Sequence, residues 1–317
     1  MDEIRIAGAG LAGLAAASTL AREGFKVRVL GRKGCSGHDG PPYTCIIKNT
    51  PENNVIKELR KFHINLKAYE INPRVIKVSP SFEKNVGFRH YYQLMMGQHK
   101  NSLENQLYVE CLAESVNFEF NTEAEKANII ATGPPSNQAN ICGYGHVYAK
   151  PPVDKETTYL LYNNDIAPHG YTYISTQDGR TTVMAVVFSR QHFPKIRQLF
   201  NHGLETFKPL KEKIGGAKRI GEVSGVGYYL KDPYANLTLE NALYVGEAAG
   251  IQDAARGFGI RYAIISGALA AKSIIEKVDY YQLMKDYFGD EFQRNYERRH
   301  LHDRLSNKDY DKIVALA

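Results

Sequence analysis

The first thirty residues alternate between short apolar stretches and an amphipathic segment. "EIRIA" (3–7) predicts a buried strand, 11–23 predicts a helix closed by Gly24, and "FKVRVL" (25–30) predicts a second strand. A strand, a helix and a strand in so short a segment form a β-α-β unit, and such units build parallel sheets. The pattern therefore predicts an α/β domain that starts at the N-terminus.

Further along the chain the pattern changes. The segment 32–50 is rich in Gly, Pro and small polar residues, which predicts a loop, whereas 101–115 has helical periodicity and 126–133 is typical of a buried strand. Between about 144 and 230, runs of β-branched and aromatic residues are separated by turn signals. This region predicts an antiparallel sheet with a helix inserted near 197–208.

The α/β pattern resumes near residue 236. "NALYVG" (241–246) predicts one more strand, followed by a glycine-rich turn and a long apolar helix, and 279–317 is polar and helical in character. We expect an α/β fold in which a Rossmann-type domain, with a parallel sheet discontinuous in sequence, is interrupted by an antiparallel β-sheet domain. The expected division is 1–60, 98–140 and 236–275 for the nucleotide domain, 61–97 and 141–235 for the substrate domain, and 276–317 for a C-terminal helical segment.

The first glycine cluster, "GAGLAG" (8–13), is a G-x-G-x-x-G motif that follows a strand and opens a helix. Gly8 permits the tight turn, Gly10 lets a pyrophosphate approach the backbone, and Gly13 lets helix and strand pack closely. The free N–H groups and the positive end of the helix dipole then face the phosphates. In this position the motif predicts a dinucleotide site with contacts from Gly8, Gly10, Leu11, Ala12 and Gly13.

The end of the second predicted strand departs from the usual dinucleotide pattern. An acid is expected there to hold the ribose hydroxyls, but the chain has Gly31, followed by Arg32 and Lys33. An arginine at this point can accommodate the 2′-phosphate of NADP. Alternatively, Arg32 covers the adenine or ribose and the acid has been lost at some cost in affinity. On either interpretation Arg32 and Lys33 are predicted cofactor contacts.

A second glycine-rich turn (244–260) lies more than two hundred residues from the first. A site for NAD alone has no evident need of it, whereas a flavin dinucleotide is extended and reaches further along the sheet. Glu247 would hold the ribityl hydroxyls, and the helix that begins near Gly259 would point its N-terminus at the pyrimidine edge of the flavin. We therefore predict FAD, with contacts from Gly246, Glu247, Gly250, Gly257, Gly259 and Ile260.

These motifs resemble the geranylgeranyl reductase family, within the flavoproteins shaped like p-hydroxybenzoate hydroxylase. The family stretch G-D-A-A-G-x-x-x-P-x-x-G-x-G-I stands here as "GEAAGIQDAARGFGI" (246–260). "APHGYTYISTQDGRTTVMAVV" (167–187) resembles the glycine-tyrosine-aromatic strand pair of the family's substrate domain, and "KANIIATGPPS" (126–136) stands where the family has an alanine-aspartate-glycine turn. The resemblance covers most of 1–275. It implies further cofactor contacts from Lys100, Ala131, Thr132 and Gly133.

The chain also departs from the family pattern at several positions. Besides Gly31, Glu247 and Thr132 each replace an aspartate, and Ala254 replaces a proline. Glu247 keeps the charge on a longer arm. In the substrate strand the residues that replace the family's tryptophan and phenylalanine are Tyr173 and Ser175.

The resemblance implies an FAD-dependent oxidoreductase in which reduced flavin delivers hydride to a carbon-carbon double bond of a polyprenyl, geranylgeranyl-type lipid. Tyr171 and Tyr173 alternate on a strand, so both face one side, where they would line an apolar substrate pocket or serve as ordinary sheet aromatics. Cys45 stands where relatives place a cysteine near the flavin, although a packed cysteine is the simpler interpretation. No triad or paired carboxylates point to a catalytic acid, so the catalytic residues stay unassigned.

Reducing power must come from outside the FAD domain, because the chain has a single G-x-G-x-x-G motif. Transient binding of NAD(P)H or a donor such as ferredoxin are the two predicted sources. Two alternative functions remain open. One is a flavin-dependent aromatic monooxygenase of the same fold, and the other is a degenerate flavoprotein that binds a lipid or partner without turnover, which the missing ribose acid motivates.

Composition argues against several classes of partner and site but does not itself indicate a function. The 317 residues are 43% hydrophobic and 23% charged, and the net charge of +6 is interleaved along the chain, which favours a solvated surface over a nucleic-acid partner. The four cysteines form no CxxC pair and no metal-type spacing with histidine, which argues for a reducing compartment and against a metal site. No apolar run approaches the ~18 residues of a membrane span. We expect a cytoplasmic protein, with peripheral membrane contact left open by the basic stretch 294–304.

Overall fold

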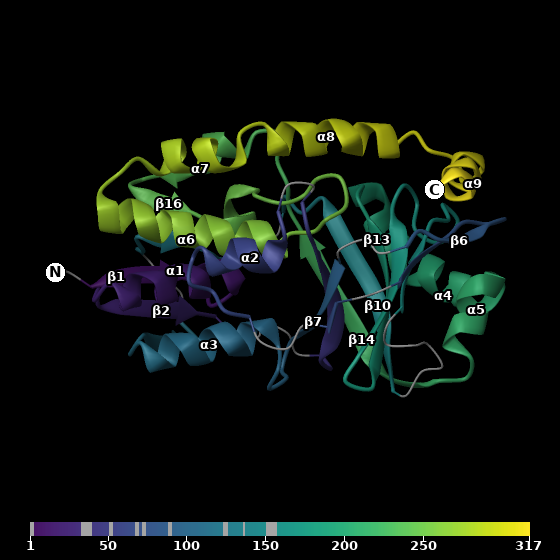
Figure 1. The fold of residues 1–317 in the computed structure, drawn as a ribbon, viewed down its shortest axis with the longest axis horizontal. Helices are drawn as coiled ribbons and strands as arrows, with labels where there is room; N and C mark the ends of the chain where they lie inside the picture. The colour runs from purple at the N-terminus through teal and green to yellow at the C-terminus, as the bar shows by residue number, and fades with distance from the viewer. Residues whose placement is uncertain are drawn as a thin grey trace.

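The computed structural model describes residues 3–32, 40–50, 53–66, 70–71, 74–87, 91–122, 126–135, 137–149 and 157–317. The strands in these segments form three sheets, which lie side by side along the long axis of the molecule beneath a row of C-terminal helices (Figure 1).

The six-stranded sheet contains the N-terminal β-α-β unit and has the order β15-β16-β9-β1-β2-β8. All neighbouring strands are parallel except the β15–β16 pair. The predicted parallel sheet, discontinuous in sequence, is therefore confirmed. Its strands are β1 (Ile4–Ala7), β2 (Val27–Gly31), β8 (Asn117–Phe120), β9 (Ile129–Ile130), β15 (Thr238–Leu239) and β16 (Ala242–Tyr244).

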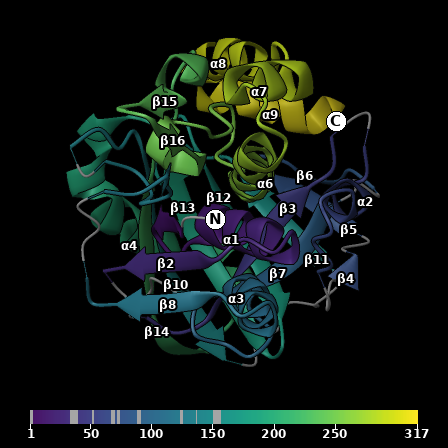
Figure 2. The ribbon, with the colours of Figure 1, turned by 90° about the vertical axis from the view of Figure 1, so that its left-hand side faces the viewer.

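Helices α1 (Leu11–Arg22), α3 (Leu103–Ala113) and α6 (Ile260–Glu276) pack around this sheet, and α6 lies directly over α1 (Figure 2). The alanine-rich face of α1 permits this close approach. A methyl group at Gly267 of α6 would lie 2.1 Å from the Ala12 carbonyl oxygen of α1. Small side chains at this crossing therefore bring the first turn of α1 against the middle of α6.

The seven-stranded sheet has the order β14-β10-β13-β12-β11-β5-β6 and is antiparallel except where β5 pairs with β11. The predicted inserted antiparallel sheet is confirmed. It consists of β5 (Arg74–Val78), β6 (Glu83–Asn85), β10 (Ile141–Ala149), β11 (Thr157–Leu161), β12 (Tyr171–Gln177), β13 (Arg180–Val187) and β14 (Lys218–Gly227). The predicted helix inserted in this region appears as α4 (Ile196–Thr206), preceded by η1 (Arg190–Lys195) and followed by α5 (Lys208–Ile214). Phe200 of α4 and Leu210 of α5 are fully buried in the core beneath one face of the sheet.

The third sheet corrects the prediction of a loop over 32–50. Within that segment, β3 (Tyr43–Lys48) pairs with β7 (Tyr91–Met96), which in turn pairs with β4 (Glu70–Ile71). The alternating "YTCIIK" has strand character, but the Gly- and Pro-rich residues before it dominate the local pattern. Residues 33–39 lie outside the described part of the chain.

The C-terminal segment forms α7 (Tyr280–Phe288), α8 (Glu291–His302) and α9 (Asn307–Leu316), which run along the molecule from α6 to the edge of the seven-stranded sheet (Figure 1). At that edge Ser81 donates to Asp311 of α9 through its N–H at 2.9 Å and its hydroxyl at 2.8 Å. None of the described helices combines the length and apolarity that a membrane span requires. The remaining elements are α2 (Val55–Arg60), η2 (Pro233–Asn236) and η3 (Gly246–Ala249).

Candidate cofactor and substrate site

The first glycine turn connects β1 to α1 and packs tightly against the end of β9. Gly8 has φ +113°, and a Cβ there would lie 2.2 Å from the Ala131 carbonyl oxygen and 3.0 Å from the Thr132 nitrogen. At Gly13 a Cβ would lie 2.0 Å from the Gly8 carbonyl oxygen. Both positions therefore require glycine. The structure brings Gly8, Gly13, Ala131 and Thr132 together, as expected from the sequence motifs.

Gly10 stands at the N-cap of α1 and differs from its neighbours, because a Cβ there would meet nothing within 4 Å. No side chain in the described part of the chain caps this helix end, and its first turn contains no acid. The first intrahelical bond runs from the Leu14 N–H to the Gly10 carbonyl oxygen at 2.9 Å. The N–H groups of Leu11, Ala12 and Gly13 precede this first bond and have no partner within the helix, an arrangement that suits a phosphate.

The second glycine turn meets the first. Gly246, in the turn after β16, has φ +58°, and a Cβ there would lie 3.1 Å from the Ala12 Cβ. Its N–H donates to the Ser266 hydroxyl of α6 at 2.9 Å, which ties the turn to that helix. Gly250 ends η3 in the left-handed conformation at φ +72°. Two backbone turns more than two hundred residues apart in sequence therefore form one continuous surface.

A cavity of about 210 Å³ lies in front of the first turn of α6. Like α1, α6 starts from a glycine N-cap, Gly259, with no side-chain cap among the described residues and no acid in its first turn. Strands β3, β10, β12, β13 and β14 supply the other walls. The predicted site residues that line the cavity are Tyr171, Tyr173, Glu247, Gly257, Gly259 and Ile260.

The two predicted substrate tyrosines present their rings, rather than their hydroxyls, to the cavity. The Tyr171 hydroxyl donates to the Arg256 carbonyl oxygen at 2.7 Å, and the Tyr173 hydroxyl donates to the Thr44 carbonyl oxygen at 3.1 Å. Burial raises the pKa of both phenols well above the ordinary value, so both stay neutral. Beside them, burial raises the pKa of the Cys45 thiol to about 12, which makes it a packed, protonated side chain.

Glu247 is the one carboxyl among the described residues that line the cavity. Burial raises its pKa to about 7, and its Oε1 accepts a hydrogen bond from the Gln252 Nε2 at 2.5 Å. The Gln252 amide also packs against the α6 N-cap, because a Cβ at Gly259 would lie 2.3 Å from its Nε2. Near neutral pH Glu247 therefore exists in both protonation states and can either accept a hydrogen bond from a hydroxyl group or donate one.

Two of the three predicted cationic contacts are exposed in the described part of the chain. Arg32 is exposed just beyond the end of β2, and Lys33 lies outside the described residues. Lys100 is exposed in the turn before α3, where its carbonyl oxygen accepts from the Asn105 Nδ2 at 3.0 Å. Gly133 has φ +77°, and a Cβ there would meet nothing within 4 Å, so open space lies next to it. The contacts of these four residues with a cofactor therefore stay a prediction.

Sequence reasoning overlooked several cavity residues. Tyr43 lines the cavity from β3, inside the segment predicted to be a loop, and burial raises its pKa well above the ordinary value. Gln252 and Phe258 lie within the second glycine-rich turn, but nothing in their residue type distinguished them there. The strand alternation of "YTCIIK" was the one sequence signal that could have placed Tyr43 and Cys45 on a shared face.

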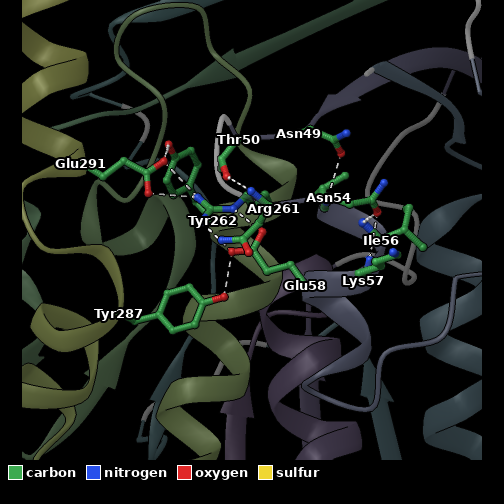
Figure 3. A network of polar contacts seen from close by, with 12 residues as sticks. Asn49, Thr50, Asn54, Ile56, Lys57, Glu58, Arg261, Tyr262, Tyr287 and Glu291 are labelled. Atoms are coloured by element: carbon green, nitrogen blue, oxygen red, sulfur yellow. Dashed lines mark hydrogen bonds and ion pairs between the residues drawn. The ribbon is translucent and has the colours of Figure 1, made fainter. Parts of the chain in front are cut away.

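A buried ionic network holds the first turn of α6 in place (Figure 3). Arg261 donates through Nε and Nη2 to the two carboxylate oxygens of Glu58 on α2, each at 2.7 Å, and through Nη1 to Glu291 on α8 at 3.0 Å. The Tyr287 hydroxyl donates to Glu58 at 2.8 Å, and the Tyr262 hydroxyl donates to Glu291 at 2.5 Å. Glu58 and Arg261 are 1% and 7% exposed. Bidentate pairing of this kind fixes orientation as well as distance.

The residues present fit an extended dinucleotide such as FAD. A glycine turn leaves open space at an uncapped helix N-terminus, and the turn before α6 continues that surface to a second uncapped N-terminus. The Glu247 carboxyl and the cavity with aromatic walls come next along this surface. Such an order suits phosphates at one end and a flat ring, on which negative charge develops, at the other.

Comparisons with known proteins agree with this arrangement. The family model described as pyridine nucleotide-disulphide oxidoreductase matches residues 2–165, just over half of the chain. A digeranylgeranylglycerophospholipid reductase of Methanosphaerula palustris is 28% identical over 148 residues, which are 46% of this chain and 36% of that protein. The chain thus spans well under half the length of this curated relative.

Solved structures extend the likeness to the whole fold. A geranylgeranyl bacteriochlorophyll reductase-like protein from Thermoplasma acidophilum superposes with a TM-score of 0.74 at 16% identity, covering 99% of this chain and 90% of that one. A flavin-dependent brominase superposes with a TM-score of 0.63 at 12% identity, covering 99% and 93%. The predicted resemblance and fold class are therefore confirmed, whereas the fold by itself is compatible with more than one flavin chemistry.

Proposed function

The chain belongs to the pyridine nucleotide-disulphide oxidoreductase family, and we propose that it reduces carbon-carbon double bonds of a polyprenyl, geranylgeranyl-type lipid. The predicted enzyme class, an FAD-dependent oxidoreductase, agrees with this membership. The lipid substrate is supported by the curated relative, which carries the name of a digeranylgeranylglycerophospholipid reductase. When bound and reduced by an external electron donor, FAD would supply the hydride that such a reduction needs.

One observation carries the proposal. The N-termini of α1 and α6 open onto a single surface, and that surface leads into an aromatic-walled cavity. We assign the phosphates of the dinucleotide to the α1 end of this surface, with the loop after β9 beside it. The residues assigned there are Gly8, Gly10, Leu11, Ala12, Gly13, Ala131, Thr132 and Gly133, with Lys100, Arg32 and Lys33 as outer cationic contacts.

The flavin end is assigned to the second turn and the first turn of α6. Backbone N–H groups at the α6 N-terminus would stabilise negative charge on the ring, and Glu247 would bond to the ribityl hydroxyls. Gly257 and Gly259 leave room for a flat ring to approach the backbone. The contacts proposed here are Gly246, Glu247, Gly250, Gly257, Gly259 and Ile260.

The substrate is assigned to the aromatic side of the cavity. Because the hydroxyls of Tyr171 and Tyr173 are tied to backbone carbonyls, the rings present apolar surface that suits an isoprenoid chain and excludes water. The proposal also includes the division of the chain into an FAD-binding domain and a substrate domain. We further propose that the protein is cytoplasmic, with peripheral contact to a membrane, and that NAD(P)H or ferredoxin donates the electrons.

The test is reduction of the flavin followed by its oxidation with substrate. Protein purified with FAD is reduced under anaerobic conditions, and a geranylgeranyl lipid is added while the absorbance spectrum is recorded. We expect the oxidised spectrum to return with the unsaturated lipid and not with its fully saturated analogue. Reoxidation only by oxygen together with an aromatic acid would replace the proposal by a monooxygenase, and a colourless protein that takes up no FAD would replace it by a non-catalytic binding module.

A further inference from the structure

Gln252 is a buried amide at the point where the second glycine turn meets the start of α6. It is 6% exposed and lines the cavity. A Cβ at Gly259 would lie 2.3 Å from its Nε2, 2.6 Å from its Oε1 and 2.7 Å from its Cδ. Gly259 has φ −82°, which any residue adopts, so the Gln252 amide and not the backbone conformation excludes a side chain there. The amide is therefore packed against the N-cap of α6.

Both polar ends of the Gln252 amide are engaged. Its Oε1 accepts the Asp253 N–H at 2.8 Å, and its Nε2 donates to Glu247 Oε1 at 2.5 Å. An amide has one acceptor end and one donor end, so the bond from the Asp253 N–H settles which end faces the backbone. The backbone of the turn thereby directs the donor end of Gln252 at the Glu247 carboxyl.

The Glu247 carboxyl depends on this one contact. Among the residues that the structure describes, Gln252 alone hydrogen-bonds to it, and no cation forms an ion pair with it. A Cβ at Gly227 of β14 would lie 3.2 Å from Glu247 Oε1, so this oxygen lies against the wall of the cavity. The other carboxyl oxygen, Oε2, is then the one that is left for a ligand.

We propose that Gln252 is a positioning residue, which holds Glu247 Oε1 so that Oε2 accepts a ribityl hydroxyl of the cofactor. This inference rests on the proposed contact between Glu247 and the flavin end of the site. A glutamate side chain that is free to rotate loses freedom when it binds a ligand, and that loss weakens binding. A hydrogen bond from a fixed amide removes part of the freedom beforehand. It also stabilises the carboxylate, which is the stronger acceptor.

The FAD affinities of four proteins test the positioning. Gln252→Met keeps the length of the side chain but removes the donor, and we expect it to weaken FAD binding to the apo-protein about three- to tenfold. In a Glu247→Ala background the same substitution should have no further effect, because no carboxyl is left to position. Titration calorimetry compares the wild type, the two single variants and the double variant. Equal losses from Gln252→Met with and without Glu247 would mean that Gln252 acts through packing alone, and would overturn the proposal.

Gln93→Met is the matched control. It removes a fully buried amide on β7, which donates to Thr158 Oγ1 at 3.2 Å and is not among the described residues that line the cavity. It should leave the FAD affinity unchanged. A wild type that binds no FAD, or binds it equally well after Glu247→Ala, would remove the proposed Glu247 contact and this inference together. Loss of affinity in Glu247→Ala but not in Gln252→Met would remove the inference alone.

Gln252→Glu keeps the shape of the side chain and makes the contact depend on pH. A protonated carboxyl at this position still donates to Glu247, whereas two ionised carboxylates so close together repel each other. We expect FAD affinity near that of the wild type while the pair holds one proton, and a loss of about tenfold or more as the second carboxyl ionises above about pH 7. The wild type should show no such loss. A ratio of the two affinities that is constant with pH would contradict the proposal.

The apo-protein gives a readout that needs no cofactor. Burial raises the pKa of Glu247 to about 7, and the hydrogen bond from Gln252 opposes this rise. Gln252→Met should therefore raise the pKa further, which infrared titration of the carboxyl C=O band, assigned with Glu247→Gln, measures. An unchanged pKa would show that the amide does not hold the carboxyl. Burial raises the pKa of the other titratable groups that line the cavity far above this range, so they do not interfere; these are Tyr43 and Cys45 on β3 and Tyr171 and Tyr173 on β12.

Discussion

Gly10 and Gly13 belong to one motif but are glycines for different reasons. A methyl group at Gly13 would lie 2.0 Å from the Gly8 carbonyl oxygen, so this position is closed by the fold itself. At Gly10 a methyl group would meet nothing within 4 Å, and φ is −84°, which any residue adopts. The fold does not require glycine at Gly10, so its absence of a side chain points to a ligand.

Substitution by alanine should therefore mainly weaken FAD binding at Gly10 and mainly lower stability at Gly13. We expect Gly10→Ala to leave the free energy of unfolding of the apo-protein within about 0.5 kcal/mol of wild type and to weaken FAD binding at least about tenfold, because the methyl group fills the space needed by the pyrophosphate. Gly13→Ala should cost about 1–3 kcal/mol through overpacking. Urea unfolding and quenching of flavin fluorescence measure the two effects. Wild-type FAD affinity in Gly10→Ala would show that the phosphates bind elsewhere.

The first turn of α6 is positioned by two neighbouring helices rather than by its own sequence. Arg261 joins α6 to Glu58 of α2 and to Glu291 of α8, and the pair with Glu58 is almost fully buried. A cation near a helix N-terminus opposes the helix dipole, but the two carboxylates offset this charge. The network keeps the backbone N–H groups of α6 directed at the cavity, so it links the packing of three helices to the proposed flavin end of the site.

Removal of one partner should be costly because it leaves Arg261 with part of its charge uncompensated in the interior. We expect Glu58→Ala to lower the free energy of unfolding by about 3–5 kcal/mol. Glu276→Ala removes one partner of the exposed Lys272–Glu276 ion pair on α6. This variant should change the free energy of unfolding by about 0.5 kcal/mol or less. Urea midpoints compare the two. Similar losses for both variants would mean that the buried network contributes no more than a surface ion pair.

Local elements of this fold were predictable from the sequence, and pairings between distant segments were not. Strand β1, helix α1 and the turn before α6 carry their signals within a few residues, because glycine spacing and apolar periodicity are local properties. The β3–β7 pairing joins residues near 45 and 94, and the Glu58–Arg261 contact spans 203 positions. The sequence carries no local signal for either pairing, so Tyr43 and Arg261 could not be placed at the site without the structure, whereas the family resemblance pointed to Cys45.

The tertiary structure raises the pKa of two carboxyl groups by packing several elements around each of them. Glu247 lines the cavity where the two glycine turns and the seven-stranded sheet meet. Glu104 in α3 is 4% exposed, and both of its carboxylate oxygens lie 3.3 Å from the Gly97 nitrogen. Burial raises the pKa of each to about 7. Both shifts are therefore consequences of the tertiary structure and disappear when the chain unfolds.

These shifts make stability depend on pH with a definite sign. Between the ordinary carboxyl pKa of 4.5 and the folded value of about 7, the folded protein binds more protons than the unfolded chain, so both carboxyls lower stability as pH rises through this window. His146 and His302 act in the opposite direction, because burial lowers the pKa of each to about 4 and stability then rises between about 4 and 6.5. In the wild type, the opposite contributions of the carboxyls and the histidines to the pH dependence of stability therefore partly cancel.

Variants that lack one of the carboxyls separate its contribution to the pH dependence of stability from that of the histidines. Glu247→Gln and Glu104→Gln remove one titration each and leave both histidines in place, so their stability relative to wild type should increase from about pH 4.5 to about pH 7.5. Since each pKa unit corresponds to about 1.4 kcal/mol, the gain should be on the order of 1–3 kcal/mol per variant. Urea unfolding of the apo-protein at both pH values measures it. If the difference from wild type is constant across this range, the two carboxyls titrate normally, and Glu247 enters the site as a permanent anion rather than as a group that can donate a proton.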